Sequence, residues 1–155
     1  MPNVKQLFLE NQLCFPLYVC SKEVIRQYKP YLDEIGLTYT QYIVMLVLWQ
    51  KKSLSTKELG AYLYLDSGTL TPLLKKLELS GLISRRRDEA DARNVIISLT
   101  EKGLSLRRRA ETIPVRMGQC LHLTDKEAQM LYELLYKLLG NLEIHHEKEK
   151  NDERL

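Results

Sequence analysis

Hydrophobic side chains recur at helical intervals along much of this chain. In residues 11–34 the apolar positions follow the period of an amphipathic helix: they are Leu13, Leu17, Val24 and Tyr28. Pro16 and Pro30 fall inside this stretch and require local adjustment of the helix. A second helix is expected after Thr40, a candidate N-cap, because the run IVMLVLW is almost wholly apolar and suits a helix packed on several sides.

Two short helices in tandem are predicted next. Ser55 and Glu58 form an S-x-x-E capping box, which predicts a short helix through Leu63. Asp66 or Ser67 is a suitable cap for the following helix. That helix has one apolar stripe, made of Leu70, Leu73, Leu74 and Leu77, and Gly81 is expected to end it.

Strand-like composition then replaces the helical pattern. LISRRR and VIISLT flank the charged segment DEADARN, which is long enough to be an extended hairpin loop and therefore predicts a wing. Thr100 is expected to cap a helix from Glu101 to about Gln119, bent at Pro114, and a Thr124/Glu127 capping box begins the last helix. The fold class is thus mainly α with a small β-hairpin wing, a winged helix-turn-helix.

Composition narrows the function classes. The 155 residues are 45% hydrophobic and 28% charged, which predicts one folded domain. The chain has neither a signal peptide nor an apolar run of about 20 residues, so we expect a cytoplasmic protein with no membrane partner. The net charge of +3 is too small to predict a binding partner by itself. Residues 67–87, however, hold five basic side chains against one acid, Glu78, and this local positive charge favours nucleic acid as the partner.

Candidate DNA-binding residues lie on the second tandem helix and on the wing. The helix contributes Asp66, Ser67, Thr69, Thr71, Lys75 and Lys76, and the wing contributes Arg85, Arg86, Arg87 and Arg93. Hydroxyls and lysines suit bases and phosphates in a major groove, and an arginine at a loop tip suits a minor groove. The simpler alternatives are an ordinary surface helix and a solvated turn with an Asp91 to Arg93 ion pair.

Three widely spaced cysteines, Cys14, Cys20 and Cys120, argue against a structural disulfide framework. With three histidines and no C-x-x-C pair, no metal and no cofactor are expected. The default interpretation of a lone Cys14 is a small buried hydrophobe. Cys20 follows Cys14 by six residues, off its helical face, and is expected to pack.

The segment ELGAYLYLDSGTLTPLLKKLELSGLISRRRDEADARNVIISLT resembles the helix-turn-helix and wing of the MarR repressor family, including its D-x-R before the second strand. LENQLCFPLY and QYKPYLDEIGLTYTQY are similar to the organic-hydroperoxide resistance regulators (OhrR type) within that family. The resemblance implies a homodimer that binds a pseudo-palindromic operator in double-stranded DNA. It implies a single domain, 1–155, with a DNA-binding lobe at about 50–100 and dimerisation helices at about 5–35 and 101–147.

The same resemblance implies a redox sensor. Cys14 lies near the start of the first helix, where a thiolate is favoured, and organic hydroperoxide would convert it to a sulfenic acid. Tyr28 and Tyr39 match the tyrosines that donate hydrogen bonds to the sensor sulfur in such regulators. Cys120 resembles the second, resolving cysteine of a two-cysteine type, in which an intersubunit disulfide releases the operator.

Several alternatives stay open. Cys14 could pair with a small cellular thiol while Cys120 only packs, or the regulator could respond to a phenolic ligand, or it could be a broader oxidative-stress and virulence regulator with the same sensor. A thiol peroxidase is a further rival, but no peroxidase motif is visible and we expect no enzyme. Apolar crowding in the last helix supports the dimer; the residues are Leu121, Met130, Leu131, Leu134, Leu135, Leu138 and Leu139, with Leu7 and Phe8 at the N-terminus.

Overall fold

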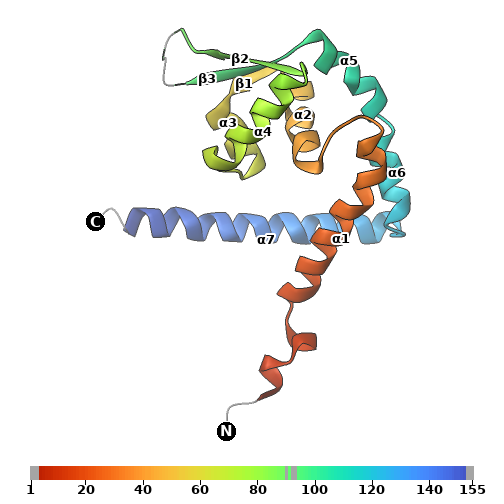
Figure 1. Cartoon of the computed structure of the whole chain (residues 1–155). Helices are drawn as coiled ribbons and strands as arrows, with labels where there is room; N and C mark the ends of the chain where they lie inside the picture. Colours follow the sequence, from red (N-terminus) through yellow and green to blue (C-terminus); the bar gives the residue numbers. More distant parts are fainter. Residues whose placement is uncertain (1–3, 90, 92–93, 153–155) are drawn as a thin grey trace. The chain divides into compact units, whose positions relative to one another are not determined.

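The computed structural model describes residues 4–89, 91 and 94–152, with side chains for 5–89, 91 and 94–142. The chain divides into two compact units, residues 1–114 and 115–155 (Figure 1). The first unit contains the tandem helices, the wing and most of the buried core. The fold is mainly helical with a small antiparallel sheet, as the sequence predicted.

The first unit begins with two 3-10 turns, η1 (Val4–Leu7) and η2 (Leu9–Asn11), before the long helix α1 (Cys14–Asp33). Pro16 lies in the first turn of α1, where no intrahelical N–H is needed, and Pro30 lies within its last turns. Helix α2 (Tyr39–Lys51) follows. Its N-cap is Thr38, whose side chain forms a capping box with Gln41, so the expected cap at Thr40 is wrong.

The tandem helices α3 (Thr56–Leu63) and α4 (Ser67–Leu79) begin at the predicted caps. Ser55 and Glu58 cap α3 reciprocally, and Asp66 rather than Ser67 caps α4. A Cβ at Gly60 would lie 2.7 Å from the Leu65 carbonyl, so only glycine permits this tight approach between the two helices. The predicted leucine stripe of α4 is buried, which fixes the opposite face of α4 towards solvent.

The wing is the hairpin of β2 (Ile83–Arg87) and β3 (Val95–Leu99), as expected. A third strand that the sequence did not reveal, β1 (Ser53–Ser55), pairs with β3, and the strand order is β1-β3-β2. Arg85 pairs in register with Ile97. Ala90, Ala92 and Arg93 lie outside the described residues.

The expected single bent helix after Thr100 is two helices, α5 (Glu101–Ala110) and α6 (Ile113–Cys120). Pro114 is the second residue of α6 and therefore belongs to the first turn of a new helix, where proline is well tolerated. The Thr100 cap is confirmed, and the Thr124/Glu127 capping box begins α7 (Asp125–Asp152) in the second unit. None of the helices in the described part of the chain is both long and apolar enough to span a bilayer.

Candidate functional site

Cys14 is the first residue of α1 and is exposed. The cap position before it, Leu13, provides no side-chain hydrogen bond to the first turn, in which the Phe15 N–H donates to the Gln12 carbonyl and Pro16 has no N–H. A thiolate at Cys14 would experience the positive end of the helix dipole. The exposure of Cys14 does not support its interpretation as a buried small hydrophobe.

Tyr28 and Tyr39, the two tyrosines expected at the sensor, lie against each other with ring centroids 5.0 Å apart. Burial raises the pKa of both phenols, and for Tyr28 the neighbouring Tyr39 raises the pKa further. Tyr42, which the sequence did not single out, extends the group: its ring is 5.9 Å from Tyr28 and 6.3 Å from Trp49. Burial raises the pKa of Tyr42 to about 12, so these phenols remain neutral hydrogen-bond donors at physiological pH.

Cys14 and Tyr28 lie fourteen residues apart on one continuous helix. At the helical rise per residue, that separation is about 21 Å, so the Tyr28 of a chain is out of reach of its own Cys14. Tyr18, one helical turn beyond Cys14 on the same face, is the tyrosine that lies near it within the chain. Lys22 Nζ lies 5.0 Å from the centre of the Tyr18 ring. The i, i+4, i+8 spacing of Cys14, Tyr18 and Lys22 in the sequence would have predicted that these three side chains lie along one face of α1.

The solvent-facing side of α4 holds the predicted DNA-reading residues, and all six are exposed. Three of them, Asp66, Thr69 and Thr71, already make side-chain hydrogen bonds within this segment, and the Thr69 hydroxyl donates to the Asp66 carboxylate at 3.2 Å. The Asp66 carboxylate accepts the Thr69 backbone N–H at 2.7 Å, which lowers the pKa of Asp66, and the Thr71 hydroxyl donates to the Ser67 carbonyl at 2.7 Å. Lys75 and Lys76 provide the positive charge of this face.

The wing arginines do not behave alike. Arg85 is partly buried and donates to Glu78 of α4 from both Nε, at 2.8 Å, and Nη2, at 2.5 Å. This contact lowers the pKa of the Glu78 carboxyl and ties β2 to α4. Arg86 and Arg87 are exposed, and Arg93 lies outside the described residues. Arg85 therefore stabilises the packing of β2 against α4, whereas the charged side chains of Arg86 and Arg87 are exposed to solvent.

Cys120 is the last residue of α6 and is partly buried, in the second unit of the chain. Cys20, which was expected to pack, is exposed on α1. Within the described residues, no group of three or more His, Cys, Asp or Glu side chains converges as a metal site requires.

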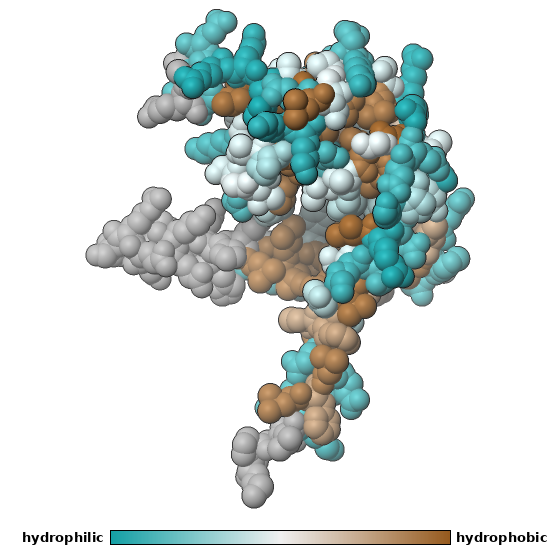
Figure 2. Space-filling model, viewed as in Figure 1, coloured by the Kyte–Doolittle hydropathy of each residue, from teal (hydrophilic) through white to brown (hydrophobic). Residues whose placement is uncertain are grey.

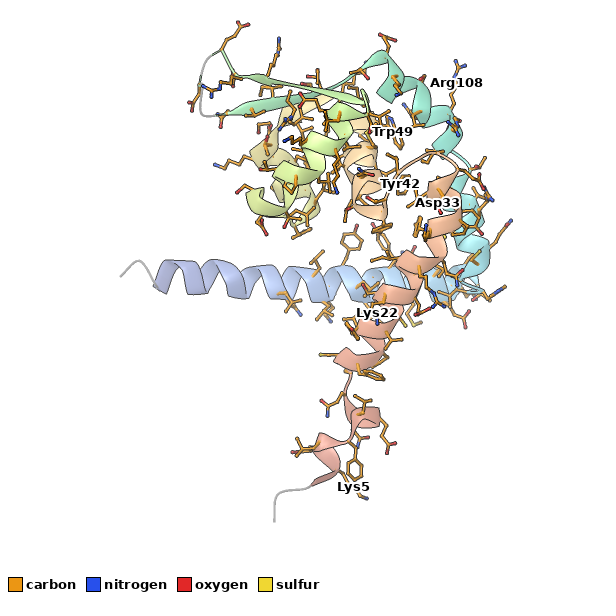
Figure 3. The ribbon with its side chains drawn as sticks, in the orientation of Figure 1. Lys5, Lys22, Asp33, Tyr42, Trp49 and Arg108 are labelled. Carbon is orange, nitrogen blue, oxygen red and sulfur yellow. The ribbon has the colours of Figure 1, made fainter. Side chains whose placement is uncertain are left out.

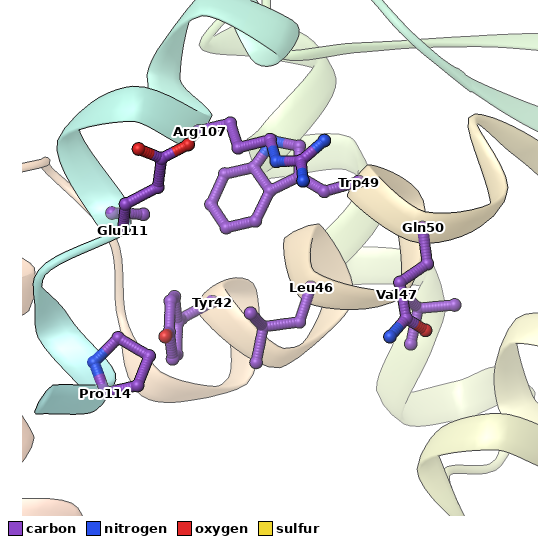
Figure 4. Close-up of a pocket in the computed structure, with 9 residues that line it drawn as sticks. Tyr42, Leu46, Val47, Trp49, Gln50, Arg107, Glu111 and Pro114 are labelled. Carbon is purple, nitrogen blue, oxygen red and sulfur yellow. The ribbon is translucent and has the colours of Figure 1, made fainter.

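A cavity of about 320 Å³ lies between α2 and α5 (Figure 4). Tyr42, Leu46 and Trp49 supply an apolar, aromatic wall, and charge comes from Arg107 of α5 and from Glu111, the residue that follows this helix. Such a cavity suits a small aromatic or aliphatic molecule with one anionic group. The sequence did not single out Arg107, because its basic run, 107–109, gives no sign of which arginine faces inward.

Comparison with known proteins supports one functional class. Residues 26–109 match the family "Transcriptional regulator SarA/Rot". The chain is 49% identical over 140 residues to the organic hydroperoxide resistance transcriptional regulator of Bacillus subtilis, covering 90% of this chain and 93% of that protein.

Two solved structures of a protein called AbfR, which is from Staphylococcus epidermidis, are also similar. Reduced AbfR bound to DNA has a TM-score of 0.74 and 36% identity, covering 89% of this chain and 96% of AbfR. Disulfide-formed AbfR has a TM-score of 0.61 and 37% identity, covering 89% and 94%. The chain therefore resembles regulators that bind DNA and whose cysteines change redox state.

Proposed function

The chain belongs to the MarR family of transcriptional regulators, together with the SarA/Rot proteins, and we propose that it is a repressor whose Cys14 senses organic hydroperoxides. It is a cysteine-based, redox-sensing regulator that binds DNA as a homodimer. The observation that carries the sensor proposal is the exposed Cys14 at the N-terminal end of α1. Organic hydroperoxide is the expected signal, as the name of the Bacillus relative states for that protein.

DNA binding would use α4 and the wing of each subunit. The exposed face of α4 would enter a major groove, with Lys75 and Lys76 attracting phosphates, and the wing would lie over the adjacent minor groove. Two lobes related by a two-fold axis read a pseudo-palindromic operator, because each half-site repeats the other. Arg93 is proposed as the minor-groove residue from its place in the D-x-R segment.

The dimer would be built from α1 and α7. Both carry apolar side chains that a monomer leaves exposed, and Figure 2 shows brown side chains along each helix. On α1 these include Leu13, Leu17 and Ile25, and on α7 they include Met130, Leu134 and Leu138. A second copy of the chain would cover this surface, as obligate dimers do. We propose 1–155 as one domain, with the DNA-binding lobe at about 50–100.

Dimerisation also supplies the sensor with its tyrosines. Cys14, Tyr18, Ser21, Ile25 and Tyr28 fall at heptad-like intervals and so lie on one face of α1. If two α1 helices cross antiparallel on a two-fold axis near Ser21, Cys14 of one protomer lies beside Tyr28 of its partner. The neutral phenols of Tyr28 and Tyr39 would then donate hydrogen bonds to the sulfur.

The proposed chemistry has two steps. The Cys14 thiolate attacks one peroxide oxygen; the O–O bond breaks, the sulfur is oxidised to sulfenic acid, and the other oxygen takes up a proton and leaves as the alcohol. The thiol of Cys120 from the partner then attacks this sulfenic sulfur, forms an intersubunit disulfide and releases water. The disulfide would shift the two lobes out of register with successive major grooves, and a thiol reductant would reset them.

Operator binding by fluorescence anisotropy tests this proposal. Reduced protein should bind, organic hydroperoxide should abolish binding, and dithiothreitol should restore it. Cys14→Ser should bind DNA normally and ignore the oxidant, whereas Cys20→Ser, the matched control on the same helix, should respond as the unmodified protein does. Retained release by Cys14→Ser would overturn the sensor assignment and leave the DNA-binding fold in place.

The cavity between α2 and α5 favours a second candidate, release by a phenolic ligand. Trp49 and Tyr42 would hold an aromatic ring, and Arg107 would pair with an acidic group. Arg107→Gln should then abolish release by such a ligand without changing the response to hydroperoxide. If a phenolic carboxylate leaves operator binding unchanged up to its solubility limit, release by a phenolic ligand is eliminated.

A further inference from the structure

A second cavity in the first unit, of about 330 Å³, lies on a different side of α5. Its walls are the turn after α1, the turn between α4 and β2, and α5 itself. The lining residues are Ile35, Gly36, Ser80, Leu82, Lys102, Ser105, Leu106 and Arg109. Lys102, Ser105 and Arg109 follow one another at i, i+3 and i+7, so one face of α5 supplies all three.

The charge of this cavity has one sign. Lys102 and Arg109 line it, and none of the lining residues that the structure describes is acidic. Lys102 Nζ donates at 2.7 Å to the backbone carbonyl of Ser80, and Arg109 donates to the backbone carbonyl of Glu34. Neutral carbonyls hold these two side chains in place without neutralising their charge.

The two cationic groups are held by carbonyls of two different elements. The Ser80 carbonyl belongs to the end of α4, whereas the Glu34 carbonyl belongs to the end of α1. The Cα atoms of Lys102 and Arg109 are separated by about 10 Å along α5. A lysine has three N–H donors and an arginine five, so each retains donors for a ligand after binding its carbonyl.

We propose that this cavity binds a small organic molecule that carries two anionic groups, carboxylates or phosphates, one paired with Lys102 and the other with Arg109. Two anionic groups suit this arrangement because the two cations are anchored to carbonyls of different elements, Ser80 at the end of α4 and Glu34 at the end of α1. The buried Leu82 and Leu106 provide an apolar floor for the carbon skeleton between the two anionic ends. The ligand would therefore differ from the phenolic class, which fits the aromatic cavity across α5.

The position of the cavity would allow its ligand to regulate DNA binding through the orientation of α4. It joins the C-terminal end of the recognition helix α4 to α5 and to the end of α1, so a bound ligand would fix these three elements against one another. The N-terminal end of α4, which would read the bases, is about 20 Å away along the helix. Bound ligand would thus stabilise one orientation of α4 without occupying the DNA surface, a coupling between two separate sites.

Binding is tested on the full-length reduced protein without DNA, so that the result does not depend on the Cys14 proposal. Citrate is the probe with several anionic groups, and inorganic phosphate is the probe with one. Backbone amide shifts in ¹H–¹⁵N NMR spectra, recorded at constant ionic strength, should move saturably with citrate at Gly36, Ser105 and Arg109. Phosphate should produce weaker shifts at one end of the cavity only.

Two variants and one control locate the site. Arg109→Gln should weaken citrate binding by about tenfold or more, the effect of losing one charge-assisted hydrogen bond. Ser105→Phe should block the cavity by filling it without changing the net charge. Arg108→Gln removes the same charge one residue earlier, from a side chain that extends away from the fold, and should bind citrate normally (Figure 3).

The outcomes distinguish a specific citrate site in the cavity from non-specific electrostatic attraction of citrate to the positively charged protein. Saturable citrate shifts that Ser105→Phe abolishes and Arg108→Gln preserves would support the proposal. Shifts that never saturate, or that weaken equally in Arg108→Gln and Arg109→Gln, would overturn it, because such binding would follow overall positive charge. Normal citrate binding by Ser105→Phe would also overturn it, because the ligand would then lie elsewhere.

Discussion

The indole N–H of Trp49 donates a hydrogen bond of 2.9 Å to the backbone carbonyl of Gly103. This contact joins α2 to the first turn of α5, immediately after the wing strand β3. Gly103 itself cannot carry a side chain, because a Cβ there would clash with the backbone carbonyl of Leu82. Trp49 also contacts Tyr42, which contacts Tyr28, so one aromatic row connects the proposed sensor tyrosines to the start of α5. Tyr42 and Trp49 are labelled in Figure 3.

Trp49→Phe should destabilise the protein by about 1 kcal/mol, because the hydrogen bond from the indole N–H to the buried Gly103 carbonyl is lost while most of the apolar contact remains. Urea unfolding followed by circular dichroism measures the change, since Trp49 is the single tryptophan and fluorescence would be lost with it. Tyr62→Phe, a change at an exposed position, is the control. An unchanged unfolding midpoint in Trp49→Phe would mean that the hydrogen bond contributes nothing to the lobe.

Arg85→Ala and Arg86→Ala should separate stability from DNA binding. Arg85 pairs with Glu78, so its loss should lower the melting temperature. Arg86 is exposed, and its loss should weaken operator binding and reduce the slope of log K against log salt by about 1 per subunit. Anisotropy titrations at several salt concentrations, combined with thermal melts, measure both effects. The opposite pattern would place Arg85, not Arg86, at the DNA backbone.

Much of the fold followed from local patterns in the sequence. The capping boxes at Ser55 and Thr124 and the leucine stripe of α4 depend on residues a few positions apart, so sequence reveals them directly. Strand β1 was missed because three residues carry too little pattern, and it exists only through its pairing with β3. Thr38 was overlooked as a cap because Thr40 lies closer to the apolar run.

The sites were predictable to a smaller extent. Cys14 and the two tyrosines were proposed by resemblance, but the separation of Cys14 from Tyr28 by about 21 Å follows only from the continuity of α1 between them. The hydrogen bond from Arg85 to Glu78 joins residues that are seven positions apart and lie in different elements, so no local sequence pattern predicts it. Spatial neighbours from separate elements are what the sequence alone does not reveal.

Tyr42→Phe should make the protein more resistant to alkaline pH. Burial raises the pKa of folded Tyr42 to about 12, above its ordinary value of 10.0. The unfolded chain therefore releases the proton first, so the stabilising contribution is complete below pH 10 and is lost as the pH rises towards 12. Urea unfolding between pH 9 and about 11 should show a shallower loss of stability in Tyr42→Phe. An identical pH dependence in both proteins would contradict the burial of this phenol.

Ser21→Cys should crosslink to its own copy if the α1 helices cross on a two-fold axis near this residue. A residue on such an axis faces itself across the interface, within reach of a disulfide. The test uses a chain in which Cys14, Cys20 and Cys120 are replaced by serine, so the introduced thiol is alone. Gln27→Cys, on the opposite face of α1, is the control and should remain monomeric on a non-reducing gel. Crosslinking of the control alone would exclude this crossing.

Cys120→Ser decides whether Cys14 is resolved by a second protein cysteine or by a small thiol. Cys120 ends α6 and is partly buried, so it is protected from direct oxidation and suited to attack a sulfenic acid delivered by the partner. After organic hydroperoxide, the unmodified protein should run as a covalent dimer on a non-reducing gel, and Cys120→Ser should run as a monomer. Mass spectrometry should then find Cys14 of this variant as sulfenic acid or, after addition of a small thiol, as a mixed disulfide.

Cys20→Ser is the control for this experiment, because it removes an exposed thiol from α1 and should leave the crosslink intact. Operator release should follow the same division. Cys120→Ser should release DNA fully only when a small thiol is supplied, since the lobes otherwise lack the disulfide that displaces them. A crosslinked dimer that persists in Cys120→Ser would assign the bond to another cysteine pair, and an unmodified protein that never crosslinks would make this a one-cysteine sensor.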